Sequence, residues 1–154
     1  MTTEPIKYYC DNSFHKYDQY MWEQLLDYIF KIADQVEFNI LIKNEPVPFE
    51  ISALSDDLIG FEKRKNKVYS TGMSVKYSLT NQVKAFIKSK QYKEWYNYYY
   101  EDMSFLLNNQ EILATITHEN HVIMMLTEDK KNELTNLGYD FWCEWPDPRN
   151  QPQV

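Results

Sequence analysis

Three short apolar runs follow one another in the C-terminal half of the chain, at residues 103–107, 111–117 and 121–126. Each run has the length of a β-strand. Two polar segments separate them, at 108–110 and 118–120, and both contain asparagine, a residue typical of turns. Strand-length apolar runs joined by short turns predict a three-stranded β-meander.

The longest helical pattern covers residues 13–35. Apolar side chains recur there every three or four positions and form one stripe, as in a helix that packs one face on a core. The stripe consists of Phe14, Tyr17, Met21, Leu25, Tyr28, Ile29, Ile32 and Val36. Asn12 or Ser13 is the expected N-cap, because a short side-chain oxygen accepts a hydrogen bond from the first turn. We therefore expect a long N-terminal helix as the central packing element.

Residues 36–43 alternate between apolar and polar side chains. This period of two predicts a strand with one buried face. Pro46 and Pro48 follow it, and proline has no N–H to donate to a neighbouring strand. Any strand through Phe49 and Ile51 is therefore restricted to the edge of the sheet.

The middle of the chain predicts a hairpin with a basic tip. Apolar residues at 58–61 and 68–70 flank the segment 62–67, which is rich in lysine. A charged tip is typical of a solvated hairpin, and it could also contact phosphate or an acidic partner. The pattern of residues 72–79 is ambiguous.

Two further helices are expected after the hairpin. Thr80 is the expected N-cap of a helix that reaches about residue 99. Thr127 caps a short helix that ends at Gly138, since glycine readily adopts the left-handed conformation beyond a helix end. Residues 139–145 return as a strand or pack as an aromatic clasp.

These elements predict one α+β domain. A mostly antiparallel sheet with a C-terminal meander packs against the N-terminal helix and one or two further helices. We assign residues 1–145 to this domain and 146–154 to a flexible tail. The chain of 154 residues, with 44% hydrophobic and 16% aromatic residues, is long enough to bury a core.

Composition excludes several classes of function. The formal net charge of −7 argues against a nucleic-acid binder, which needs a surplus of lysine and arginine. Only three glycines are present, so glycine-rich phosphate-binding loops are absent and no cofactor is expected. No apolar stretch approaches the length of a membrane span, so we expect no membrane partner.

The N-terminal residues and the cysteines indicate the cellular compartment in which the protein acts. The N-terminal residues lack the apolar region of a signal peptide, and the two cysteines, Cys10 and Cys143, lie near opposite ends of the chain. We expect both to be reduced thiols in a cytoplasmic protein. Many lysines, asparagines and tyrosines beside few arginines and glycines indicate an AT-rich, bacterial genome.

The segment 92–102 is the densest aromatic stretch of the chain and ends in two carboxylates. Its helical stripe predicts core packing for part of the segment. Tyr98 and Tyr100 fall off that stripe and, with Glu101 and Asp102, are our candidates for a partner-binding surface. Tyrosine supplies rigid anchors at interfaces, and the acidic balance favours a basic partner.

His118 and His121 are the sharpest candidates for a metal or acid–base site. If Glu119-Asn120 forms a two-residue hairpin turn, the two imidazoles stand opposite each other on one face, close enough to share a metal. Glu101, Asp102 or His15 could supply a third ligand. The alternative is a structural turn with polar flanks. Because no other catalytic motif is present, a small enzyme at this turn is the second hypothesis.

Three segments of the C-terminal third carry a resemblance, at residues 101–105, at 112–119 and in the short helix that ends with Leu137-Gly138. Together they resemble small acidic bacterial proteins of the toxin-immunity kind. The resemblance implies a non-enzymatic inhibitor whose acidic surface occupies the basic active site of a toxin. Our leading hypothesis is therefore a protein-binding module.

Overall fold

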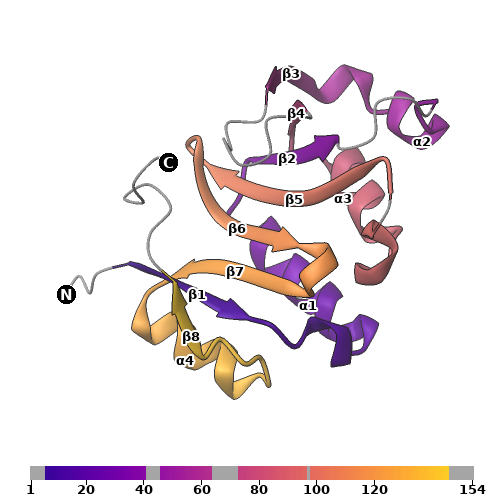
Figure 1. The fold of residues 1–154 in the computed structure, drawn as a ribbon. Helices are drawn as coiled ribbons and strands as arrows, with labels where there is room; N and C mark the ends of the chain where they lie inside the picture. The colour runs from indigo at the N-terminus through magenta and orange to yellow at the C-terminus, as the bar shows by residue number, and fades with distance from the viewer. Residues whose placement is uncertain (1–5, 41–45, 64–72, 97, 146–154) are drawn as a thin grey trace.

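The computed structural model describes residues 6–40, 46–63, 73–96 and 98–145. In these residues, eight strands form a single antiparallel sheet with the order β3-β4-β2-β5-β6-β7-β1-β8 (Figure 1). The strands are β1 (Lys7–Asp11), β2 (Gln35–Ile40), β3 (Leu58–Lys63), β4 (Met73–Ser78), β5 (Tyr100–Leu107), β6 (Gln110–Ile116), β7 (His121–Leu126) and β8 (Cys143–Trp145).

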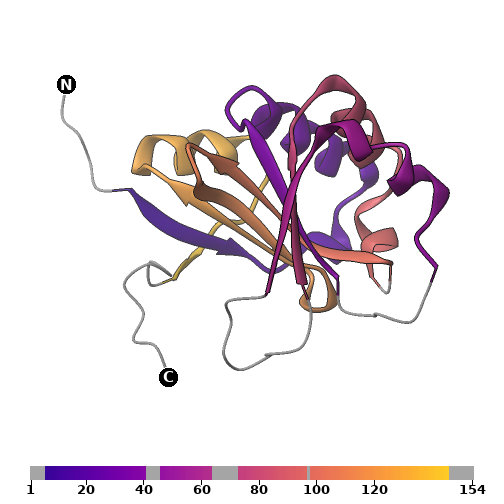
Figure 2. The same ribbon diagram turned by 90° about the horizontal axis from the view of Figure 1, so that it is seen from above.

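Four α-helices and four short 3-10 helices connect the strands. The α-helices are α1 (Gln19–Phe30), α2 (Phe49–Ser52), α3 (Asn81–Lys88) and α4 (Glu128–Asn136). The 3-10 helices are η1 (Phe14–Lys16), η2 (Ser55–Asp57), η3 (Tyr92–Trp95) and η4 (Thr117–Glu119). Figure 2 shows α1, α3 and α4 on the same side of the sheet.

The core lies between these helices and the sheet. Alternation along β2 places Val36, Phe38 and Ile40 toward the helices, and all three are buried. From the helix side, α1 contributes Trp22 and Leu26, which are 1% and 0% exposed. The predicted α+β class and the mostly antiparallel sheet are confirmed.

The predicted meander is also confirmed. β5 pairs with β6, and β6 pairs with β7, all antiparallel. Asn108 and Asn109 form the two-residue turn between β5 and β6, with φ angles of +52° and +63°. Asparagine tolerates this left-handed conformation better than most residues, which explains its place in the turn.

The prediction of a long N-terminal helix over residues 13–35 is wrong. α1 has 12 residues and begins at Gln19, and its N-cap is Asp18, whose side chain accepts a hydrogen bond from the Met21 N–H at 3.0 Å. The expected cap, Ser13, instead donates its own N–H to the Asp11 carboxylate at 2.8 Å. This contact stabilises a separate 3-10 turn before α1.

Two other predicted boundaries are wrong. The second helix, α3, ends at Lys88 instead of continuing to residue 99, because the chain turns and starts again as η3. The segment from Phe49 to Ser52 is a short helix, where an edge strand was expected. Pro48 immediately precedes this helix, and its fixed φ angle suits that position.

The predicted caps of the later helices are confirmed. The Thr80 and Thr127 side chains accept hydrogen bonds from the N–H groups of Val83 and Lys130. Gly138 follows α4 with a φ of +104°, where a residue with a Cβ atom would be strained. The predicted strand at 58–61 lies within β3, whereas the second predicted strand at 68–70, most of the basic tip and the tail at 146–154 lie outside the described residues. β3 pairs with β4, which covers most of the segment 72–79 whose pattern was ambiguous.

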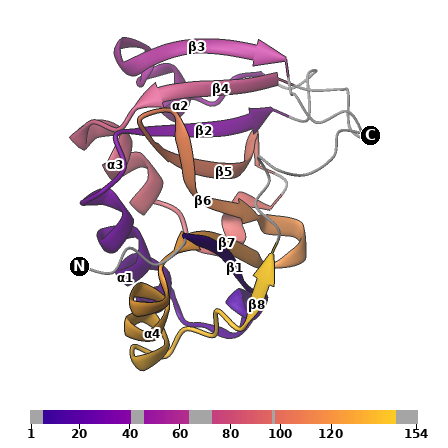
Figure 3. The same cartoon turned by 90° about the vertical axis from the view of Figure 1, so that its left-hand side faces the viewer.

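The two ends of the described chain lie side by side in the sheet. β1, which the sequence did not predict, pairs with β7 on one side and with β8 on the other (Figure 3). Residues 139–145 combine both expected forms, because β8 is a strand while Tyr139 and Phe141 are buried. Within the described residues, no helix has the length and apolar character needed to cross a membrane.

Candidate functional site

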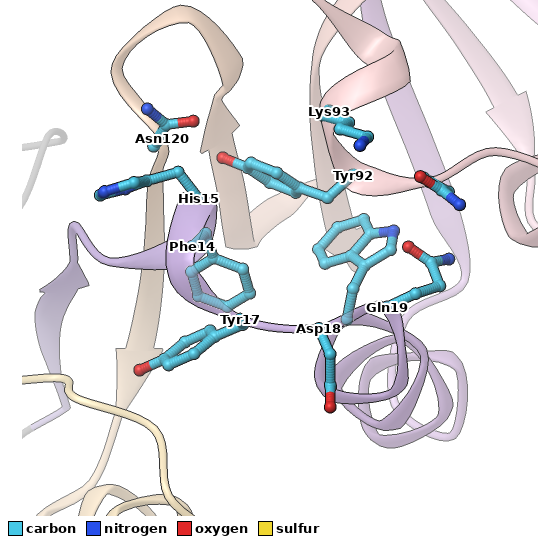
Figure 4. Close-up of a pocket in the computed structure, with 10 residues that line it drawn as sticks. Phe14, His15, Tyr17, Asp18, Gln19, Tyr92, Lys93 and Asn120 are labelled. Carbon is cyan, nitrogen blue, oxygen red and sulfur yellow. The ribbon is translucent and has the colours of Figure 1, made fainter.

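A cavity of about 360 Å³ lies where η1 and the start of α1 approach η3 and the turn after η4. Figure 4 shows Phe14 and Tyr92 side by side within the group of lining residues, with His15, Lys93 and Gln19 around them. The lining residues are Phe14, His15, Tyr17, Asp18, Gln19, Trp22, Gln91, Tyr92, Lys93 and Asn120. Its volume is typical of cavities that bind small molecules or an inserted side chain.

The walls of the cavity are aromatic rings in mutual contact. The ring centroids of Phe14 and Tyr92 are 5.3 Å apart, and those of Trp22 and Tyr92 are 5.1 Å apart at an interplanar angle of 72°. Phe14 also meets Trp22 edge-to-face at 6.1 Å. These ring contacts pack the aromatic side chains against one another, so the wall is formed without a ligand.

The buried carboxylate of Asp11 positions one side of the cavity. Asp11 is 0% exposed and accepts hydrogen bonds from the Ser13 N–H at 2.8 Å and the Tyr17 hydroxyl at 2.6 Å. It also accepts from the Asp140 N–H at 2.8 Å. Burial, together with the bond to Asp11, raises the pKa of the Tyr17 hydroxyl. These bonds tie η1 to the end of β1 and to the segment before β8.

The opposite side of the cavity depends on η3 and the η4 turn. The Glu94 side chain accepts from the Gln91 N–H at 3.1 Å and closes the first turn of η3. The Tyr92 hydroxyl then donates to the His121 carbonyl at 3.2 Å, and burial raises its pKa. Asn120, in the left-handed conformation with φ of +58°, ends η4 beside this contact.

The cavity combines an apolar wall with several polar groups that could hold a ligand. Gln19, Gln91 and Asn120 contribute side-chain amides, and His15 and Lys93 are exposed. The indole Nε1 of Trp22 is buried and has no hydrogen-bond partner among the described residues. A buried donor without an acceptor costs free energy, so this donor lowers the stability of the wall next to the cavity.

The structure separates the four residues predicted to bind a partner. Tyr100 is 2% exposed, so the prediction that it lies at the surface is wrong. Its ring stacks on Phe38 at 4.9 Å, and its hydroxyl shares a 2.8 Å hydrogen bond with that of Tyr77. Tyr100 is the first residue of β5, and in that strand it faces the core.

Tyr98, Glu101 and Asp102 have structural contacts. The half-buried Tyr98 donates to Glu50 Oε1 at 2.8 Å, and Lys90 Nζ lies 3.9 Å from its ring centroid. Glu101 is 9% exposed and lies opposite Asn39, on the sheet face away from Tyr100. Asp102 has a φ of +49° and accepts from the Thr117 N–H at 3.0 Å. The four side chains therefore do not form one surface.

The two-residue turn expected between His118 and His121 is also wrong. η4 occupies residues 117–119, and Ile116 is the residue that lies opposite His121. Both imidazoles approach Glu119, at 3.8 Å from His118 and 3.5 Å from His121. In the portion that the structure describes, no three or more His, Cys, Asp or Glu side chains gather as metal ligands, so His15, Glu101 and Asp102 do not complete this pair.

The sequence did not indicate the cavity as a site. Phe14 and Trp22 belonged to the helical stripe, and Tyr92 to the aromatic segment, so each pattern predicted core packing. Nothing in the spacing of these residues shows that they meet. Comparison of the chain with protein-family models, with curated proteins and with solved structures gives no match. We therefore infer function from the geometry of the cavity.

Proposed function

We propose that this protein is a non-enzymatic binding module and that a segment of a protein partner enters the aromatic cavity. The observation that carries this proposal is the wall of packed aromatic rings that lines the cavity. An inserted side chain would stack on Phe14 and Tyr92. Aromatic pockets of this kind dominate the binding energy of many interfaces.

Two exposed tyrosines that follow cavity-lining elements in the sequence support a protein as the ligand. Tyr20 follows the lining residue Gln19 and is 67% exposed, and Tyr96 follows η3 and is 54% exposed. Large exposed aromatic side chains are enriched in protein interfaces, where they cover the area around a central pocket. A small molecule would be held by the cavity alone and would not need them.

The net charge of −7 supports a basic partner. Opposite net charges raise the rate of association, and salt weakens this attraction. An inhibitor of a bacterial toxin, as the resemblance of the C-terminal third implies, would fit these properties. In that role the protein would bind near the basic active site of the toxin and exclude its substrate.

A matched pair of tryptophan substitutions tests the proposal. His15→Trp introduces a bulky side chain at the cavity, and Asn132→Trp introduces the same side chain on α4, which contributes no lining residue. Tagged wild-type and variant proteins are used to capture partners from a lysate of the source organism, followed by quantitative mass spectrometry. We expect one basic protein to be retained by the wild type and by Asn132→Trp and lost with His15→Trp.

The captured protein is then purified, and its affinity is measured by calorimetry at low and moderate salt. We expect at least a tenfold loss of affinity for His15→Trp and a weaker interaction at higher salt. A partner that binds His15→Trp as tightly as the wild type would move recognition away from the cavity. Equal circular dichroism spectra and thermal midpoints of the two variants control for folding.

A further inference from the structure

The two cysteines lie directly opposite each other in the sheet. Cys10 of β1 is the register partner of Cys143 of β8, although the two residues are near opposite ends of the sequence. No disulfide bond joins them in the structure. Their proximity is independent of the aromatic cavity and goes beyond the proposed binding function.

The geometry of the strand pair brings the two thiols within reach of each other. Directly opposite residues of an antiparallel pair project from the same face, with Cα atoms about 4.5–5.5 Å apart. Protein disulfides usually join residues whose Cα atoms are about 4.4–6.8 Å apart. The Cα separation expected for this pair is therefore compatible with a disulfide bond.

The two thiols differ in access. Cys10 is 3% exposed and pairs with Ile123 of β7 on its other side, whereas Cys143 is partly exposed. β8 is the last strand of the sheet, so one of its edges has no neighbouring strand among the described residues. An oxidant in solution would therefore reach Cys143 first.

We propose that Cys10 and Cys143 form a reversible disulfide that fastens β8 to β1. The Cys143 thiolate attacks a low-molecular-weight disulfide such as glutathione disulfide, giving a mixed disulfide and one released thiol. The Cys10 thiolate then attacks the Cys143 sulfur and releases the second small thiol. Two protein thiols are oxidised, one small disulfide is reduced, and the protons pass to the two released thiolates.

The link would act on the least anchored strand of the sheet. β8 has three residues and pairs only with β1 in the described structure. One salt bridge between the strands, from Lys7 to Glu144 at 3.6 Å, is exposed and contributes little to stability. A covalent bond between strands so far apart in sequence restricts the unfolded chain strongly, and so it stabilises the folded protein.

To test the proposal, the purified full chain is equilibrated with mixtures of reduced and oxidised glutathione. Remaining thiols are then blocked with N-ethylmaleimide, and the intact protein and its peptides are measured by mass spectrometry. We expect a monomer that has lost two hydrogen atoms, takes up no label, and yields a cross-linked peptide pair containing Cys10 and Cys143. Excess dithiothreitol should restore both thiols.

Two variants and a thermal measurement complete the test. Cys143→Ser removes the exposed thiol without disturbing the core, and Cys10→Ser removes its partner. Oxidation should raise the thermal midpoint of the wild type by about 5–10 °C and leave both variants unchanged. Label on both cysteines after oxidation, a persistent mixed disulfide at Cys143, or an intermolecular dimer would each overturn the proposal.

Discussion

Two groups of aromatic side chains lie on the helix-covered face of the sheet, and one of them lines the cavity described above. The sealed cluster consists of Phe38, Tyr77, Phe86, Trp95 and Tyr100. The pocket cluster consists of Phe14, Tyr17, Trp22 and Tyr92. Most members of both are almost fully buried, so exposure of single side chains does not distinguish them.

The two clusters differ in their ring packing and in their position relative to the cavity. In the sealed cluster, Phe38 stacks between Trp95 and Tyr100, with ring centroids 5.7 and 4.9 Å away. The indole N–H groups of Trp22 and Trp95 are both buried without a partner among the described residues, but only Trp22 lines the cavity. The two clusters therefore bury the same kind of donor and differ in whether their rings line this cavity.

The largest expected effect is a difference in the free energy of unfolding between substitutions in the two clusters. Phe38→Ala should lower the free energy of unfolding by about 3–5 kcal/mol, because the sealed cluster cannot fill the space left behind. Phe14→Ala should cost about 2–3 kcal/mol, because solvent can enter the enlarged space from the cavity. Urea denaturation measures both values, with Tyr96→Ala as an exposed control. Equal losses for the two phenylalanines would show that the pocket cluster is as closed as the sealed one.

A smaller effect concerns the hydrogen bond inside the sealed cluster. Tyr100→Phe should cost about 1–2 kcal/mol, because the hydroxyl of Tyr77 then stays buried without its 2.8 Å partner. Replacing both tyrosines with phenylalanine should recover part of this loss. Urea denaturation of the two single variants and the double variant measures the coupling. Strictly additive losses would mean that solvent or another group satisfies the remaining hydroxyl.

The smallest effect appears only at alkaline pH. Burial raises the pKa of Tyr92 in the pocket cluster and of Tyr100 in the sealed cluster above the ordinary value of 10.0. The folded protein therefore keeps protons that the unfolded chain releases, and the free energy of unfolding should fall as the pH rises above about 10. Denaturation between pH 8 and 11 measures the slope. Tyr100→Phe should make it shallower, and an unchanged slope would contradict the assignment to Tyr100.

The parts of the fold that the sequence predicted depend on local signals. The meander has strand-length runs bounded by Asn108 and Asn109, and the caps at Thr80 and Thr127 use a side chain next to the helix that it starts. β1 gave no such signal, because Tyr8, Tyr9 and Cys10 are buried on both faces of the sheet and do not alternate with polar residues.

The errors arise where a distant contact overrides a local pattern. Phe14 and Tyr17 continue the apolar stripe of α1, but Asp11 binds the Ser13 N–H and the Tyr17 hydroxyl and holds this segment apart from the helix. Tyr100 falls off the apolar stripe of its segment, which predicts a surface position, yet pairing of β5 with β2 makes it a core strand residue. The cavity could not be predicted, because its walls come from segments far apart in the sequence.

The pairing of β1 with β8 determines how the molecule responds to mechanical force. Tyr8 lies opposite Trp145 and Cys10 lies opposite Cys143, so the start of β1 is beside the end of β8. A pull applied to these two ends opens the backbone hydrogen bonds one after another, as in a zipper, and does not load them together in shear. A motor that unfolds proteins from a terminus would therefore detach β8 with little resistance. A covalent link between these strands would transfer its pull to the buried strands of the sheet.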